Sequence, residues 1–182
     1  MTGLVNTNNG EEPISAKKRV NILMVDDQPA KLLTYEVMLR DLDENLIKAP
    51  SAKEALTILL KMDIAVVLLD VSMPEIDGFE LADMIRQHPR FEETAIIFIS
   101  AVRMRDADRL KGYKRGGVDY ISAPVVPELL CAKVRVFADV YRKSRQLEDL
   151  NETLQAPSTR LIEVRSMSHL LHPPLLDQGG SV

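Results

Sequence analysis

The chain has 182 residues, of which 46% are hydrophobic, a formal net charge of −4 and a single cysteine, Cys131. Its length suits one compact domain with additional segments, its charge disfavours nucleic acid as a partner, and one cysteine allows neither an intramolecular disulfide nor a cysteine metal site. No window approaches the ~20 apolar residues of a membrane span, and residues 1–19 lack the apolar core of a signal peptide. We therefore expect a cytoplasmic protein without a membrane partner, with a flexible leader over residues 1–19.

Residues 20–141 alternate between apolar runs typical of buried strands and amphipathic segments typical of helices. Strands are predicted at residues 20–26, 45–49, 64–70, 95–99 and 118–121. Helices are predicted at residues 29–42, 79–88 and 103–115, and from residues 51 and 126 onward. Ser51 and Glu54 have the spacing of a capping box. Gly116-Gly117 is predicted to end the fourth helix, and Pro157 the last one.

Five strands that alternate with helices, and that are apolar along their length, predict a parallel sheet covered on both faces. Right-handed crossovers leave few topologies. We expect a doubly wound, flavodoxin-like α/β fold with strand order 2-1-3-4-5 and an extended C-terminal helix. In such sheets ligands bind beyond the carboxyl ends of the strands, where the order reverses between strands 1 and 3.

Three carboxylates are predicted at that edge, because Asp26 and Asp27 follow the first strand and Asp70 ends the third. A carboxylate at the end of a buried strand is costly unless its charge is used. Mg²⁺ prefers oxygen ligands and keeps several waters. We predict a Mg²⁺ site in which Asp27, Asp70 and the Ser72 carbonyl oxygen are direct ligands and Asp26 acts through a water. The carboxylate of Asp70 can also attack phosphorus; the alternative is that these acids only favour helix starts.

Four segments carry a family resemblance: residues 22–27, 69–78, 99–101 and 119–124. On these motifs the chain resembles, over residues 20–141, the receiver domain of two-component response regulators. The resemblance implies Asp70 as phosphoacceptor, with Asp26 and Asp27 as the acidic pair. It also implies Ser100 as the switch hydroxyl and Tyr120 as the rotating aromatic. In receivers, phosphorylation draws the hydroxyl toward the phosphoryl group, the aromatic turns inward, and a surface changes.

One position departs from the receiver pattern. Receivers usually carry a lysine before the proline of the fifth loop, where this chain has Ala123 before Pro124. The missing lysine would face a phosphoryl group of about −2 charge, and losing one well-placed donor can cost ~10²–10³ in rate. The peptide bond before this proline is often cis in receivers.

Two functions therefore stay open. In the first, the protein is a single-domain response regulator that accepts a phosphoryl group from a sensor histidine kinase with Mg²⁺. Its output is then phosphotransfer, for example to a histidine phosphotransfer protein, or protein contact, and it catalyses at most its own phosphorylation and dephosphorylation. In the second, it is a pseudo-receiver, a dimerisation or interaction module that needs no phosphate.

The last helix is predicted to extend beyond the receiver, over residues 142–156. One stripe is suited to packing on the sheet: Leu130, Val134, Phe137 and Tyr141. A second stripe has heptad-like steps and consists of Leu129, Lys133, Val136, Val140, Lys143, Leu147, Leu150 and Leu154. It predicts either a homodimer, through this helix or the receiver face, or an ordinary amphipathic helix.

Residues 157–182 resemble part of the second dimerisation helix of sensor histidine kinases. The phosphoaccepting helix and the ATP-binding domain of such kinases are absent from the sequence. We therefore do not expect a kinase, nor phosphoaccepting roles for His169 and His172.

Overall fold

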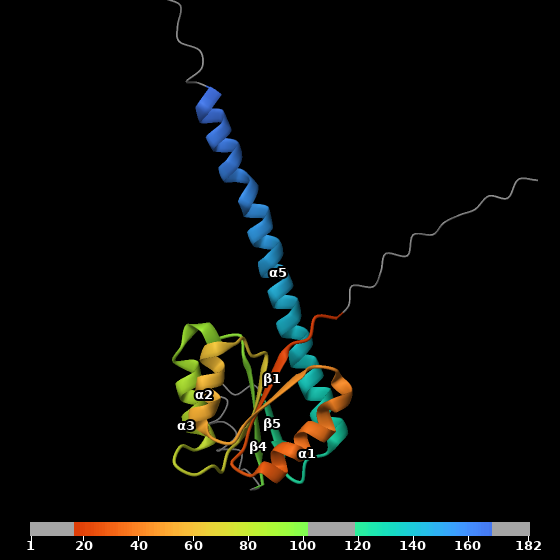
Figure 1. The fold of residues 1–182 in the computed structure, drawn as a ribbon. Coiled ribbons are helices and arrows are strands. Elements are labelled where there is room, and N and C mark those ends of the chain that lie inside the picture. The colour runs from red at the N-terminus through yellow and green to blue at the C-terminus, as the bar shows by residue number, and fades with distance from the viewer. Residues whose placement is uncertain (1–16, 102–118, 169–182) are drawn as a thin grey trace, which may run out of the picture. The chain divides into compact units, whose positions relative to one another are not determined.

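The computed structural model describes the backbone of residues 17–101 and 119–168, and the side chains of residues 17–101 and 119–155. The chain divides into two compact units, residues 1–138 and residues 139–182. The first unit contains a five-stranded parallel sheet in the order β2-β1-β3-β4-β5 (Figure 1). Its strands are β1 (Asn21–Val25), β2 (Asn45–Ala49), β3 (Val66–Asp70), β4 (Ala95–Ser100) and β5 (Asp119–Ser122). The predicted flavodoxin-like α/β fold and its strand order are confirmed.

Helices cover both faces of this sheet. The helical elements are α1 (Pro29–Leu39), η1 (Arg40–Leu42), α2 (Ala52–Lys61), α3 (Gly78–Arg86), η2 (Pro89–Phe91) and α5 (Pro127–Ser168). Helices α2 and α3 lie on one face, and α1 with the first turns of α5 on the other (Figure 1). Cys131 Sγ in α5 donates to the Met38 carbonyl oxygen in α1 at 3.0 Å. The predicted helix over residues 103–115, with its end at Gly116-Gly117, lies outside the described residues.

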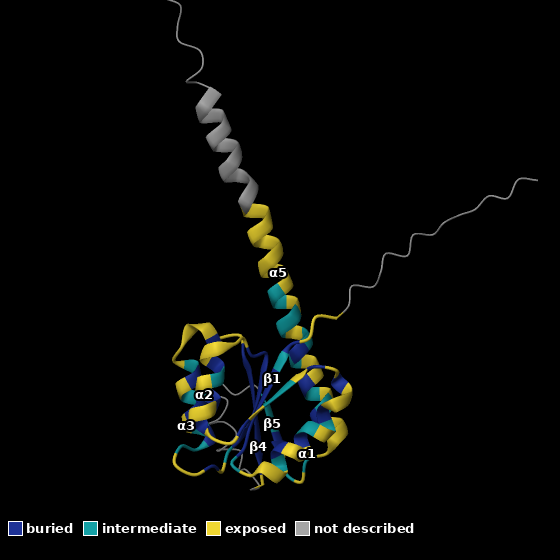
Figure 2. Ribbon diagram, in the orientation of Figure 1, coloured by how far each residue is buried: buried dark blue, intermediate teal, exposed yellow. Residues whose placement is uncertain are grey.

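Burial explains why these segments form a sheet covered on both sides. Every residue of β3 and β4 is buried, as is every residue of β1 except Asn21 (Figure 2). Because side chains alternate along a strand, Leu23, Val67 and Phe98 all point to the face where α2 and α3 complete one hydrophobic cluster. The strands are therefore apolar on both faces and cannot be edge strands exposed to water.

Helix starts follow the sequence signals, with one difference. Ser51 Oγ accepts a hydrogen bond from the Glu54 backbone N–H at 3.2 Å at the start of α2. The reciprocal capping box occurs instead at α3, where Asp77 Oδ1 accepts from the Glu80 N–H at 2.8 Å and Glu80 Oε2 accepts from the Asp77 N–H at 3.2 Å. This capping box fixes the first residues of α3, which begins at Gly78.

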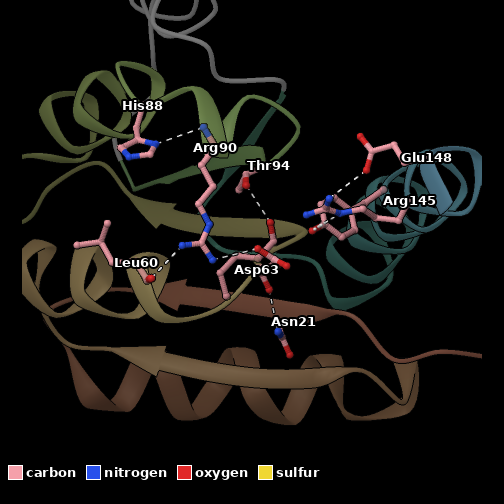
Figure 3. A network of polar contacts seen from close by, with 10 residues as sticks. Asn21, Leu60, Asp63, His88, Arg90, Thr94, Arg145 and Glu148 are labelled. Carbon is pink, nitrogen blue, oxygen red and sulfur yellow. Dashed lines mark hydrogen bonds and ion pairs between the residues drawn. The ribbon is translucent and has the colours of Figure 1, made fainter. Parts of the chain in front are cut away.

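A polar network joins the loops at the opposite, amino-terminal edge of the sheet (Figure 3). The Arg90 guanidinium donates to the Leu60 carbonyl oxygen at 3.0 Å and lies 3.2 Å from Asp63 Oδ1. The Asn21 side chain donates to the Asp63 carbonyl oxygen at 2.7 Å. The network fixes the segments that enter β1 and β3, at the edge remote from the three predicted carboxylates.

Helix α5 corrects two expectations. The helix does not end at Pro157, because α5 continues to Ser168. A proline within a helix removes one helical hydrogen bond, and here the backbone is helical on both sides of Pro157. The predicted stripe is confirmed at Leu130 and Val134, which are buried, whereas Phe137 and Tyr141 are only half-buried and Ala138 is buried in their place. No helix in the described part of the chain has the length and hydrophobicity that a membrane crossing requires.

Candidate functional site

Three carboxylates meet at the carboxyl ends of β1 and β3. Asp26 and Asp27 directly follow β1, Asp70 is the last residue of β3, and the two strands pair with Val25 opposite Leu69. One carboxylate oxygen from each acid lies within 4.8 Å of the other two. Asp26 and Asp70 are buried and Asp27 is half-buried. The acids lie together at the reversal of strand order, which is where the sequence predicts them.

Hydrogen bonds hold the carboxylate of Asp26 on both of its oxygens. Oδ1 accepts from the Gln28 backbone N–H at 2.9 Å, and Oδ2 lies 3.5 Å from the Tyr35 hydroxyl. Burial, together with the Asp26 charge, raises the pKa of Tyr35 far above its usual range, so this hydroxyl stays protonated and donates. The carboxylate of Asp26 is therefore oriented by contacts on both oxygens within the core.

The carboxylate of Asp70 is less completely satisfied. Oδ2 accepts from the Ser72 backbone N–H at 3.1 Å, and Oδ1 lies 3.4 Å from Lys31 Nζ. Burial and the nearby Asp26 charge raise the pKa of Asp70, while Lys31 and the Ser72 N–H oppose that rise. Asp70 is thus held at the end of its strand by the Ser72 N–H on one oxygen and by the longer contact with Lys31 on the other.

Lys31 is a member of the site that the sequence analysis missed. Its Nζ lies 3.2 Å from Asp26 Oδ2 as well as 3.4 Å from Asp70 Oδ1. Burial disfavours its charge, but the contacts with the two carboxylates outweigh that effect and raise the pKa of Lys31 above its ordinary value. One signal was available: Pro29 starts a helix right after the acidic pair, and a residue in that first turn lies close to it.

The half-buried Asp27 has an oxygen that suits a cation. Among the described residues, none forms a hydrogen bond with its buried Oδ1. A buried carboxylate oxygen without a partner carries a desolvation cost that a bound cation would remove. With two further carboxylates nearby, the donor set is that of a hard cation such as Mg²⁺. Ser72, the predicted carbonyl ligand, is exposed in the loop after β3.

Ser100 lies at the same edge of the sheet. Strand β4 pairs with β3 so that Ile99 faces Asp70, and the Val71 N–H donates to the Ile99 carbonyl oxygen at 3.1 Å. Ser100 is the next residue, is 4% exposed, and ends β4. The register thus brings the predicted switch hydroxyl beside the end of the strand that carries Asp70.

Tyr120 is directed into the core. Its ring stacks on Phe98 with centroids 5.1 Å apart and an interplanar angle of 24°, and Phe98 in turn contacts Phe79 at 5.0 Å. The Tyr120 hydroxyl is buried. The aromatic that the resemblance implies as rotating is therefore in an inward position in this structure.

Comparison with known proteins identifies the architecture. Residues 22–135 match the response regulator receiver domain. The chain belongs to the response regulator receiver family. It is 38% identical over 109 residues to an uncharacterised 14.6 kDa protein of Leptolyngbya boryana, covering 60% of this chain and 82% of that protein. It is 34% identical over 119 residues to the transcriptional regulatory protein YvrH of Bacillus subtilis, covering 65% of this chain and 48% of YvrH.

A solved receiver domain has the same fold. The BeF3-activated DrrB receiver domain superposes with a TM-score of 0.60 at 29% identity, and the match covers 67% of this chain and 99% of that one. The chain matches only about half of the length of YvrH. The part that this chain shares with YvrH and with the DrrB receiver domain is therefore the receiver domain.

The fifth loop shows where this receiver departs from the family pattern. The Ala123–Pro124 peptide bond is cis. The Ala123 N–H donates to the Ser100 carbonyl oxygen at 2.8 Å, so the loop is tied to the end of β4. Ala123 brings a methyl group, and no cation, to the position of the usual lysine.

The C-terminal resemblance gains no comparable support. The family match ends at residue 135, and the predicted likeness of residues 157–182 to a kinase dimerisation helix lies beyond it. Residues 169–182, with His169 and His172, lie outside the described residues.

Proposed function

We propose that this receiver accepts a phosphoryl group on Asp70 from a sensor histidine kinase. An oxygen of Asp70 attacks phosphorus, the phosphorus–nitrogen bond of a phosphohistidine breaks, and the bonding pair returns to the imidazole nitrogen. The supporting observation is the cluster itself: Asp70 and Asp26 are buried side by side, next to a buried oxygen of Asp27 without a partner among the described residues. Such a concentration of charge is costly unless it is used.

Asp27, Asp70 and the Ser72 carbonyl would hold Mg²⁺, with Asp26 acting through a water. When bound, Mg²⁺ neutralises charge on the transferring phosphoryl group. The residues of the chain supply the positioning. The Gln28 N–H and the Tyr35 hydroxyl orient Asp26, and the Ser72 N–H holds one oxygen of Asp70.

The proposed output is a change of surface. Phosphorylation would draw the Ser100 hydroxyl toward Asp70 and so alter the packing of Tyr120 on Phe98. A phosphotransfer protein or another protein partner would read that change, or take the phosphoryl group. We propose a cytoplasmic regulator that catalyses nothing beyond its own phosphorylation and dephosphorylation.

Incubation of the protein with Mg²⁺ and acetyl phosphate, followed by intact-mass spectrometry, tests this function. We expect the mass increase of one phosphoryl group, and we expect D70N to lack it. D41N, which removes an exposed carboxylate in η1, is the matched control and keeps the adduct. The absence of an adduct with acetyl phosphate and with every sensor kinase of the organism would contradict the proposal.

A pseudo-receiver is the second candidate, and Ala123 is the observation that favours it. Without the usual lysine, the fifth loop contributes no charge to the site, and contacts of the protein would then be independent of phosphate. The same experiment separates the two functions, because a pseudo-receiver gives no adduct while the wild-type protein remains folded.

We further propose a homodimer through the second unit. Three leucines in heptad-like steps, Leu147, Leu150 and Leu154, are at least 60% exposed on α5 and would pair across a two-helix seam. Lys133 belongs instead to the receiver, since it forms an ion pair with Asp119.

Sedimentation of L150K tests the seam, because a lysine at its centre should give a monomer. L60K is the control, since Leu60 is equally solvent-accessible on α2 but lies outside the seam. A wild-type monomer, or an L150K protein with the wild-type dimer mass, would remove the seam from the proposal.

A further inference from the structure

Lys31 reaches the acidic site from α1. Its ammonium lies between two buried carboxylates, 3.2 Å from Asp26 Oδ2 and 3.4 Å from Asp70 Oδ1, while a third of its side chain remains accessible. Within the described residues, Lys31 is the one basic side chain that forms ion pairs with the three acids of the cluster. Lys31 thus carries the positive charge of the cluster.

The local helix gives no reason for a lysine at this position. Pro29 is the first residue of α1, so Lys31 lies in the first turn, where no acidic residue is present. Backbone N–H groups at a helix start carry partial positive charge and disfavour a cation by up to ~1 kcal/mol. A residue that opposes a local preference is explained when the site uses its charge.

The loop after β5 lacks the positive charge that receivers usually have there. Ala123 stands where receivers usually carry a lysine, and its backbone is tied to Ser100. A phosphoryl group on Asp70 would bring about −2 charge to an edge that already has three carboxylates. A lysine has a flexible stem and a compact head with three donors. Rotation of its terminal methylenes would take Nζ from Asp70 Oδ1 to an oxygen of a group bound on that carboxylate.

We propose that Lys31 supplies, from α1, the side-chain cation that neutralises the phosphoryl group on Asp70. This inference rests on the proposed function. In the unphosphorylated protein the same ammonium occupies carboxylate oxygens that a divalent cation needs. Metal and Lys31 therefore compete before phosphorylation, and both bind the phosphoryl group after it.

Two measurements on the full chain test this role. Binding of Mn²⁺, followed by electron paramagnetic resonance, reports the competition. Binding of beryllofluoride at saturating Mg²⁺, followed by ¹⁹F NMR, reports stabilisation of a phosphoryl-like group. K31Q should bind Mn²⁺ about fivefold more tightly, because the ammonium that competes with the metal for Asp26 and Asp70 is removed. It should bind beryllofluoride at least ~10²-fold more weakly. K31R should recover part of the beryllofluoride affinity.

K48Q is the matched control, because Lys48 pairs with Glu36 of the same helix α1 but lies outside the acidic site. It should bind both ligands as the wild type does. If K31Q binds beryllofluoride as tightly as the wild type, Lys31 is only a counter-ion of the unphosphorylated state, and the inference is overturned whatever the Mn²⁺ affinity. A wild-type protein that takes neither beryllofluoride nor a phosphoryl group overturns the proposed function, and this inference with it.

Discussion

Gly78 contacts the backbone of Asp70 so closely that no other residue fits there. A Cβ built on Gly78 would lie 2.3 Å from the Asp70 carbonyl oxygen and 2.9 Å from the Cα of Val71. The Gly78 N–H also donates to the Val71 carbonyl oxygen at 3.1 Å. The start of α3 therefore rests directly on the strand end that presents Asp70, the proposed phosphoacceptor.

We predict that G78A lowers the free energy of unfolding by ~1–3 kcal/mol, because two stretches of backbone must separate. The direction of the change in stability is diagnostic. At an unconstrained helical position, alanine in place of glycine would raise the free energy of unfolding by up to ~1 kcal/mol. Urea unfolding measures the difference. E80Q, which alters only the capping box of the same helix, should cost less. A G78A protein as stable as the wild type would contradict the close approach.

Two arginines near the amino-terminal edge of the sheet, Arg86 and Arg90, should differ in their contribution to the free energy of unfolding. Arg86 is half-buried and donates to the carbonyl oxygens of Phe91 at 2.7 Å and Thr94 at 2.6 Å, just before β4. Arg90 is exposed and makes the longer contacts with Leu60 and Asp63 (Figure 3).

We expect R86A to cost ~1.5–3 kcal/mol, because charged hydrogen bonds to buried carbonyl groups are lost. R90A should cost less than ~1 kcal/mol, since water replaces its contacts. Thermal unfolding of both variants measures the ranking. Equal losses in the two variants would show that burial is not what separates these arginines.

The sheet and the acidic triad were predictable because each rests on a strong, local signal. Apolar runs too long for a half-exposed strand require two covered faces, and a carboxylate after such a run is visible in the sequence at Asp26 and Asp70. Parallel strands then place their carboxyl ends at one edge, so no side-chain detail was needed to bring the acids together.

Lys31 and Gly78 were not predictable in the same way. A lysine in an amphipathic helix is ordinarily a solvated residue, and only the packing of α1 shows that its ammonium turns toward Asp70. Gly78 has no sequence signal for its contact with Asp70, because that contact depends on how α3 returns to β3. The predicted helix end at Pro157 was wrong, because one proline removes only one helical hydrogen bond and the backbone stays helical on both sides of it.

Cys131 should react slowly with thiol reagents and should make stability depend on alkaline pH. Burial raises the pKa of its thiol above the ordinary value of 9.0, and the thiol donates to the Met38 carbonyl oxygen. Little thiolate is then present near pH 8, and thiolate is the reactive form. Because the folded pKa lies above the unfolded one, this contribution to stability is complete below pH ~9 and is lost as the pH rises further.

Iodoacetamide labelling followed by mass spectrometry measures the reactivity, with protein unfolded in guanidinium as the fast-reacting control. Comparing the wild type with C131A across pH 8–11 isolates the pH dependence from that of lysines and tyrosines. Labelling of the folded protein at the unfolded rate would show that the thiol is neither buried nor bonded.

Asp27 should lower the free energy of unfolding in the absence of metal. The same residue should be required for the stabilisation that a bound metal gives. Its Oδ1 is buried and, among the described residues, has no hydrogen-bond partner, and the other two carboxylates of the cluster lie close by. D27N removes one of three like charges and adds a donor, so we expect the free energy of unfolding in EDTA to rise by ~1 kcal/mol. Binding to the folded state stabilises a protein in proportion to the logarithm of ligand concentration, and D27N should lose most of this gain with Mg²⁺.

Thermal unfolding in EDTA and in a Mg²⁺ series measures both effects on the same samples. D41N removes an exposed carboxylate and should behave as the wild type in both conditions. A D27N protein that is less stable than the wild type in EDTA would mean that Asp27 stabilises the fold without a cation. Equal stabilisation of D27N and wild type by Mg²⁺ would place the metal elsewhere. Asp27 Oδ1 is assigned to the cation only if D27N is both more stable than the wild type in EDTA and less stabilised by Mg²⁺.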